Sequence, residues 1–315
     1  MNIPTPVLYA IGAIFAVLIV ATVIVWWIGR NKPGDGSTEL MLRVKSWWFM
    51  IGIFTFAMVI DRAISTILLG FVSYLALKEY FSLIPTRRVD RLVLLFAYLA
   101  VPIQFYWAYI GWYEMFVVFI PVWMFLFLPM VMVLQGQTEG FLRAVGTTSW
   151  GLMMTVFTLS HAAMMLVGSE DVNGEAGGAG LLLFLIALTQ FNDVAQFTWG
   201  KLTGKHAIVP SVSPKKTWEG FVGGAITTAA VAALVGPFLT VMPWYWAAVA
   251  GAMIAVAGFI GDVNMSAVKR DLKVKDSGGL IPGHGGILDR VDSLTYSAPV
   301  FFHFFAYFFA GGRVG

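Results

Sequence analysis

The sequence has no cysteine and little charge, and both absences restrict what the protein can be. Without a cysteine among its 315 residues the chain forms no disulfide bond and no thiolate metal site, so its redox compartment cannot be inferred. Only 12% of the residues are charged, against about 25% in a typical soluble domain. Because 59% are hydrophobic and the mean hydropathy is +0.81, the chain has no room for a large soluble domain.

The hydrophobic residues are gathered in ten runs separated by short polar segments, and about 20 apolar residues cross a bilayer. The first run, Val7–Gly29, is too long for the core of a signal peptide and follows no Lys or Arg, so we expect a true span. The other runs are Ser46–Ile60, Ala63–Leu77, Leu92–Ile110, Met115–Leu134, Trp150–Val167, Gly180–Phe191, Phe221–Val241, Trp244–Ile260 and Leu294–Ala310. The sequence therefore predicts an all-α, polytopic integral membrane protein with about nine or ten transmembrane helices.

Lys and Arg are distributed unevenly between the alternating loops. With the N-terminus outside, all of them except Arg62 and Arg313 fall on the side that the positive-inside rule assigns to the cytoplasm. The basic residues are dispersed in short loops, which indicates no nucleic-acid partner. We expect N-terminal membrane helices in residues 1–149. The C-terminal region, residues 150–315, is expected to be catalytic, with cytoplasmic motifs at 192–220 and 261–293.

The second of these polar segments combines acids, bases, hydroxyls and glycines. Asp262, Ser266, Lys269 and Lys273 recur at helical spacing, so a helix continuing from the preceding span would place them on one face. Ionisable residues at the membrane border are costly and usually serve a site. The glycines that follow, around His284, allow backbone N–H groups to approach an anion closely.

These residue types suit phosphoryl or nucleotidyl transfer. Asp262, Asp276 and Asp289 offer hard oxygen ligands to Mg²⁺, which binds through one or two carboxylates plus substrate phosphates. Lys269, Arg270 and Lys273 can neutralise phosphate oxygens. The alternative interpretation is a positive-inside loop in which the acids merely balance the bases.

Other polar residues have two interpretations each. Ser213–Thr217 is a compact basic turn with two hydroxyls, similar to a phosphate grip, although a plain loop has the same composition. Asp193 lies just after an apolar run, separated from it by Asn192, and is either a further acid of the site or a polar residue at a helix end. His161, inside a span, is predicted to be a hydrogen-bonded core histidine. Glu79 and Tyr80 are interpreted as a structural pair at a helix end.

Together these motifs resemble the signature of the phosphatidate cytidylyltransferases, also called CDP-diacylglycerol synthases. The resemblance is carried by Ser266–Arg270, Lys275–Asp276 and Pro282–Asp292, and by Ser213–Gly220 upstream. The N-terminal half is similar only in hydropathy and at Lys78-Glu79-Tyr80.

The resemblance implies that the phosphate of phosphatidic acid attacks the α-phosphorus of CTP, which gives CDP-diacylglycerol and pyrophosphate. It implies Mg²⁺, with a monovalent cation such as K⁺ nearby, membrane lipids as surroundings, and a homodimer in many members. It also implies a bacterial inner (plasma) membrane protein whose active site faces the cytoplasm. The residues carried over by motif position are the catalytic Asp262, Asp289, Lys269 and Asp276, the metal ligands Asp262, Asp289, Asp193 and Asp276, the phosphate ligands Ser213, Lys216, Thr217, Lys269 and Arg270, and the loop-shaping His284.

Two other functions stay open. A CTP-using enzyme could act on another lipid acceptor, such as an isoprenoid alcohol or an archaeol-type lipid phosphate. Asn192–Phe197 is similar to the Asn-Asp form of eukaryotic members rather than to the Asp-Ser or Asp-Thr form of many bacterial ones. A transporter of anions or lipids would carry ionisable residues near mid-span, whereas the acids here cluster at the inner border.

Overall fold

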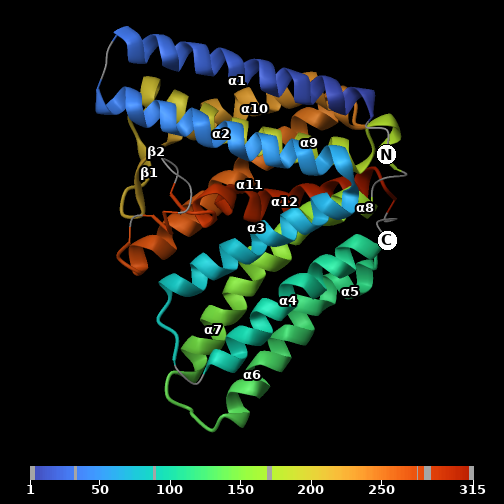
Figure 1. The fold of residues 1–315 in the computed structure, drawn as a ribbon, viewed down its shortest axis with the longest axis vertical. Helices are drawn as coiled ribbons and strands as arrows, with labels where there is room; N and C mark the ends of the chain where they lie inside the picture. The colour runs from blue at the N-terminus through green and yellow to red at the C-terminus, as the bar shows by residue number, and fades with distance from the viewer. Residues whose placement is uncertain are drawn as a thin grey trace.

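The computed structural model describes residues 4–31, 34–87, 90–168, 172–274, 276–279 and 285–311. The protein is 84% helical with almost no sheet. Nine helices within the described ranges are long and apolar enough to cross a membrane, which confirms the predicted polytopic all-α fold. Both ends of the chain lie at one end of the helix bundle, and a small β-hairpin lies at the other (Figure 1).

The elements are, in chain order, α1 (Thr5–Asn31), α2 (Asp35–Ile60), α3 (Arg62–Leu83), α4 (Arg91–Ile110), α5 (Tyr113–Val118), η2 (Phe119–Met124), α6 (Phe125–Leu134), α7 (Phe141–Leu152), η3 (Met153–Phe157), α8 (Thr158–Gly168), η4 (Gly174–Ala176), α9 (Gly177–Thr203), β1 (Ala207–Val209), β2 (Ser213–Thr217), α10 (Trp218–Leu239), α11 (Trp244–Asp271) and α12 (Leu288–Phe308). The segments α5–η2–α6 and α7–η3–α8 each form one continuous span.

Two helices continue beyond the apolar runs that predict them. α9 extends through Asp193, and α11 extends through Asp262, because these polar turns pack against α10 and α12 rather than entering solvent as loops. The prediction for Lys273 is wrong. α11 ends at Asp271, and Lys273 adopts a left-handed conformation with φ of 57°, so it leaves the helical face that carries Asp262.

The basic segment Ser213–Thr217 was predicted to be a turn, and it is a strand instead. It forms β2, which pairs antiparallel with β1 through Ala207 opposite Thr217 and Val209 opposite Ser213. The strand partner is only three residues long, so no alternating pattern announces it in the sequence. The hairpin projects from the end of the bundle between α9 and α10 (Figure 1).

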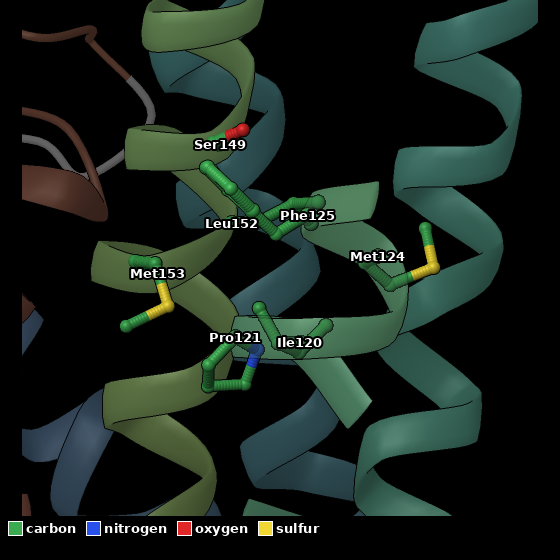
Figure 2. A pocket seen from close by; sticks show the side chains of 7 residues that line it. All are labelled: Ile120, Pro121, Met124, Phe125, Ser149, Leu152 and Met153. Atoms are coloured by element: carbon green, nitrogen blue, oxygen red, sulfur yellow. The ribbon is translucent and has the colours of Figure 1, made fainter. Parts of the chain in front are cut away.

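Two spans in the N-terminal half contain π-helical turns, η2 and η3. Pro121 lies in η2, and since proline has no N–H to donate, the helix widens locally. An apolar cavity of about 280 Å³ lies between the two turns (Figure 2). Its lining residues are Ile120, Pro121, Met124, Phe125, Ser149, Leu152 and Met153. None of these is charged, so this cavity is unsuited to a phosphate.

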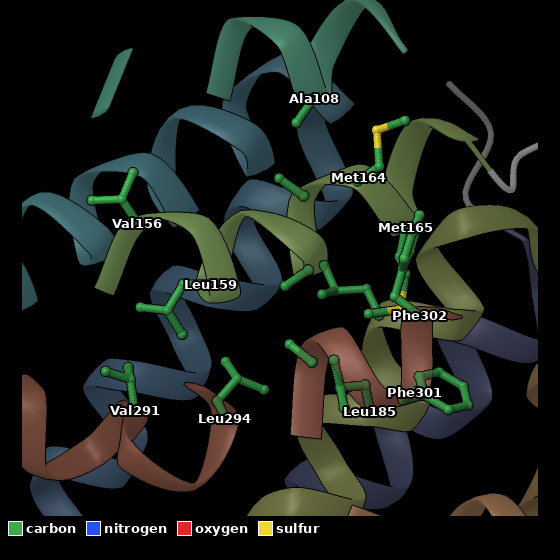
Figure 3. Packing of buried hydrophobic residues seen from close by; sticks show 14 of the residues in the cluster. Ala108, Val156, Leu159, Met164, Met165, Leu185, Val291, Leu294, Phe301 and Phe302 are labelled. Carbon is green, nitrogen blue, oxygen red and sulfur yellow. The ribbon is translucent and has the colours of Figure 1, made fainter. Parts of the chain in front are cut away.

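Part of the buried core lies where α8, α9 and α12 meet (Figure 3). Met164 and Met165 of α8 and Leu185 of α9 are fully buried there, together with Phe301 and Phe302 of α12. Three of the first five residues of α12 are charged, yet most of its length is enclosed by other helices. The acids on its first turns are therefore held in a fixed frame.

His161 is a core histidine, as predicted. Its side chain is fully buried, and Nδ1 lies 2.8 Å from the carbonyl oxygen of Phe157 one turn earlier. The imidazole packs edge-on against the rings of Phe116 and Phe302. It lies among aromatic rings of the core and belongs to none of the polar motifs.

Candidate active site

Three carboxylates from three helices come together at the hairpin end of the bundle. Asp193 lies on α9, Asp262 on α11 and Asp292 on α12. Ser293 donates its hydroxyl to both oxygens of Asp193, at 3.0 and 3.2 Å. The charge of Asp262 acts on both Asp193 and Asp292, and the latter is only 7% exposed. Like charges in a largely buried setting attract a cation.

The basic strand β2 lies against this acidic group. Lys216 forms an ion pair with Asp262, and its ammonium nitrogen lies 5.0 Å from the centre of the Phe259 ring. A cavity of about 270 Å³ lies between them, close to the lower end of the roughly 300–1,000 Å³ usual for ligand sites. The polar and charged residues of its lining are Asp193, Gln196, Ser213, Lys215, Lys216, Thr217 and Asp262. Acids, cations and hydroxyls therefore share one small space.

The hairpin is held in place by hydrogen bonds to two helices, α10 and α11. Thr217 caps α10 by accepting the Gly220 N–H at 3.2 Å. Glu219 accepts two backbone N–H groups just before β1, at 3.0 and 3.2 Å. Arg270 of α11 donates from Nε to the carbonyl oxygen of Val212 at 3.2 Å. Arg270, which was predicted to bind phosphate, thus supports the hairpin with one of its nitrogens.

Asp289 and Lys269, both predicted site residues, lie together where the first turn of α12 meets the last turns of α11. The ammonium of Lys269 is 2.7 Å from Oδ1 of Asp289, and both side chains are mostly buried. Oδ2 of Asp289 accepts the backbone N–H groups of Ser277 and Gly286, at 2.9 and 3.2 Å. These contacts engage three of about four lone-pair sites of the carboxylate, so little of it is left for a metal ion.

The remaining predicted residues are less tightly placed. Asp276 is exposed and makes no hydrogen bond or ion pair with the described part of the chain. His284 lies outside the described residues. Ser266, one turn after Asp262, donates to Oδ1 of that carboxylate at 3.3 Å, as their spacing on one helix face predicts. The chemical roles of all these residues stay predictions.

The donor atoms of the acidic group fit Mg²⁺. Within the described ranges no group of three His, Asp or Glu residues is arranged to hold a metal ion by itself. Mg²⁺ does not require one, because it keeps waters and binds through one or two carboxylates plus substrate phosphates. None of the ion pairs formed among the described residues includes Asp193 or Asp292. These two carboxylates, together with Asp262, offer the hard oxygens that this ion prefers.

Sequence reasoning missed three residues of this region. Asp292 and Ser293 follow Asp289 by three and four positions, so helical spacing from Asp289 was the available signal. Glu79 of α3 accepts the backbone N–H groups of Ile287 and Leu288, at 2.9 and 2.8 Å. Its only signal in the sequence was the short motif similarity in the N-terminal half.

The comparisons with known proteins agree with this geometry. Residues 41–308 match the model of the "Cytidylyltransferase family". The chain is 43% identical over 298 residues to the uncharacterized protein YnbB of Escherichia coli, which covers 95% of this chain and 98% of that protein. It is 41% identical over 139 residues to a phosphatidate cytidylyltransferase of Mycobacterium leprae, covering 44% of this chain and 42% of the enzyme.

A phosphatidate cytidylyltransferase of Brucella suis is 37% identical over 134 residues, covering 42% of this chain and 50% of the enzyme. The chain thus spans about half the length, or less, of the two named enzymes. The family match, in contrast, extends over most of the chain and includes every described residue of the acidic group. This integral membrane protein accordingly belongs to the cytidylyltransferase family, and it is a nucleotidyltransferase.

Proposed function

We propose that this protein transfers the cytidylyl group of CTP to the phosphate of a membrane lipid, with phosphatidic acid as the acceptor. The observation that carries the proposal is the cavity that Lys216, Ser213 and Thr217 line together with Asp193 and Asp262. Cations and hydroxyls suit the phosphates of a nucleotide, and the carboxylates suit their metal. The names of the partly matching mycobacterial and Brucella enzymes support the same acceptor.

In the proposed reaction an oxygen of the lipid phosphate attacks the α-phosphorus of CTP. A new P–O bond forms there, and the bond to the β-phosphate breaks. Its electron pair leaves with pyrophosphate, so the products are CDP-diacylglycerol and pyrophosphate. The attacking phosphate is already an anion, and no strong general base is needed. The protein contributes mainly positioning and charge neutralisation.

Each part of the site has a role in this scheme. Lys216 and Lys269 stabilise the charge on the phosphates. To do so, Lys216 weakens its contact with Asp262 and turns part of its hydrogen-bonding capacity to a phosphate oxygen. One or two of the carboxylates of Asp193, Asp262 and Asp292 would hold Mg²⁺, which would supply charge neutralisation for the phosphates. Ser293 fixes Asp193 through two hydrogen bonds. A lipid acceptor suits a site at the ends of membrane helices, because its phosphate stays at headgroup depth.

The proposal places the site on the cytoplasmic side of a bacterial inner membrane. In the alternating topology, every Lys and Arg except Arg62 and Arg313 lies on the same side of the membrane as the hairpin. The positive-inside rule assigns that side to the cytoplasm, where CTP is available.

The test is an assay of the purified protein with CTP labelled on the α-phosphate, Mg²⁺ and separate lipid phosphates. Phosphatidic acid should give labelled CDP-diacylglycerol and one pyrophosphate for each product, and Asp262→Asn should give neither. If product forms only with another lipid phosphate or with an isoprenoid alcohol, that compound would replace phosphatidic acid as the proposed acceptor. Lack of CTP consumption with every acceptor would overturn the proposal in favour of a non-enzymatic role such as transport.

A further inference from the structure

Glu79 joins the N-terminal half of the protein to the start of α12. It lies near the end of α3, which packs beside α12 in the middle of the molecule (Figure 1). Its Oε1 accepts the Ile287 N–H at 2.9 Å, and its Oε2 accepts the Leu288 N–H at 2.8 Å. Oε2 also accepts the hydroxyl of Ser277 at 3.2 Å. Both carboxylate oxygens are thus engaged by residues far away in the sequence.

These contacts supply what the first turn of α12 lacks. The first N–H groups of a helix have no partner within the helix, and no side chain caps α12 at Ile287. Glu79 satisfies two of these donors from another helix. Its negative charge is also favourable at the positive end of the helix dipole. Glu79 of α3 therefore caps α12 from another helix of the same chain.

Asp289 binds the same two stretches of chain from the other side. Its Oδ2 accepts N–H groups from Ser277 and Gly286, while its Oδ1 holds Lys269. Ser277 is shared, since its N–H goes to Asp289 and its hydroxyl to Glu79. A chain of hydrogen bonds thus runs from α3 through Glu79, Ser277 and Asp289 to Lys269 on α11.

The glycines of this region fit the same account. A Cβ on Gly286 would overlap both Oε2 of Glu79 and the hydroxyl oxygen of Ser277. A Cβ on Gly278 would lie 3.0 Å from Oε1 of Glu79, whereas one on Gly279 would meet nothing within 4 Å. Gly278 and Gly286 leave room for the carboxylate, so part of the glycine pattern is explained by a residue in the N-terminal half.

We propose that Glu79 is a positioning residue for cytidylyl transfer, which fixes the first turn of α12 and thereby Asp289 and Lys269. This role rests on the proposed function. Glu79 hydrogen bonds to backbone and to Ser277, and it does not line the cavity at Lys216. Its loss should therefore affect the chemical step more than the binding of CTP.

The first experiment compares Glu79→Gln with Glu114→Gln, which alters an exposed acid in the first turn of α5. The amide nitrogen of glutamine cannot accept a hydrogen bond, so at least one N–H at the start of α12 loses its partner. We expect kcat to fall about tenfold to a hundredfold while the KM for CTP changes less than about threefold. Glu114→Gln should match the wild type. An unchanged kcat, or a change confined to KM, would contradict the positioning role.

The second experiment measures amide hydrogen exchange in detergent, which does not depend on turnover. In Glu79→Gln at least one of the amides of Ile287 and Leu288 should exchange about tenfold faster, and both should be unaffected in Glu114→Gln. Exchange as slow as in the wild type would overturn the proposal even if kcat fell. If the wild type transfers no cytidylyl group, the proposed function fails, and exchange still decides whether Glu79 anchors α12.

A third experiment uses the glycines. Gly278→Ala should lower kcat at least about fivefold, and Gly279→Ala should leave it unchanged, because only the first Cβ approaches Glu79. In a Glu79→Ala background, which removes the carboxylate, Gly278→Ala should add less than about a twofold loss. Size-exclusion profiles verify that each variant is folded. Independent, multiplicative losses would show that Gly278 and Glu79 are not coupled, against the proposal.

Discussion

Replacing Asp292 and Asp289 separately by Asn is expected to separate a metal ligand from a structural anchor. In Asp292→Asn the new side chain keeps an oxygen that can accept the Ser293 N–H, which lies 2.8 Å from Oδ1. It removes one of three like charges, since Asp292 faces both Asp262 and Asp193. The melting temperature should therefore stay the same or rise. Activity should fall at least about a hundredfold, or roughly 2.7 kcal/mol, because an amide binds Mg²⁺ far more weakly than a carboxylate.

Asp289→Asn should behave differently. The amide oxygen can keep the Ser277 and Gly286 N–H groups, but the amide nitrogen then faces the ammonium of Lys269. The two side chains of this ion pair are only 15% and 7% exposed, so Lys269 becomes a buried cation without its carboxylate. Breaking a buried ion pair from one side costs about 3–5 kcal/mol. Both activity and the apparent melting temperature should drop.

The assay combines CDP-lipid formation over a Mg²⁺ titration with thermal unfolding in detergent. Both variants should be inactive and should differ in stability. Asp292→Asn should stay stable, whereas Asp289→Asn should be less stable than the wild type. Near-normal turnover of Asp292→Asn at ordinary Mg²⁺ would remove Asp292 from the metal site. An unchanged melting temperature for Asp289→Asn would refute the anchoring role of its ion pair with Lys269.

Three further predictions follow from single contacts. Lys216→Ala should raise the KM for CTP about tenfold or more, since it removes a cation from the cavity; the exposed Lys215, altered to Ala, should cost less. Lys205→Cys, the only cysteine in such a variant, should react with an impermeant thiol reagent from the cytoplasmic side only, and labelling of intact cells would contradict the topology. Gly224→Ala should destabilise the protein by about 1–3 kcal/mol, because the new Cβ would overlap Gln196 of α9. Gly12→Ala should not destabilise it, because a Cβ there meets nothing within 4 Å. Equal melting temperatures for the two variants would contradict that packing.

The fold follows from hydropathy because the bilayer permits little else. Backbone N–H and C=O groups in the hydrocarbon region must be hydrogen-bonded within the protein, and only helices achieve this within one segment. The run Leu294–Ala310 predicted the core of α12, although that helix begins six residues earlier, at Leu288. Hydropathy could not locate such ends, since charged residues lower it even where they are buried against other helices.

The site was less accessible to sequence reasoning, for a different reason. Asp262 and Ser266 lie on one helix, so local spacing sufficed to group them. Asp193 and Ser293 are 100 positions apart, and only tertiary packing brings them together. Lys273 shared the helical spacing but not the helix, because the chain turns into a left-handed conformation there. Spacing predicts a face only as far as the helix continues.

Glu79 also changes how the N-terminal helices are understood. Hydropathy treats α3 as a membrane span, and its buried Tyr80 indeed packs as one, donating its hydroxyl to the carbonyl oxygen of Thr147 on α7. Glu79, the residue before Tyr80, serves the site instead. It holds the first turn of α12, which carries Asp289 and Asp292. A carboxylate that binds several backbone N–H groups fixes both partners more firmly than apolar contacts do, since interhelical packing in lipid has no hydrophobic driving force. The geometry of the acidic group therefore depends on α3, and a catalytic region beginning at residue 150 would lack one of the contacts that set it.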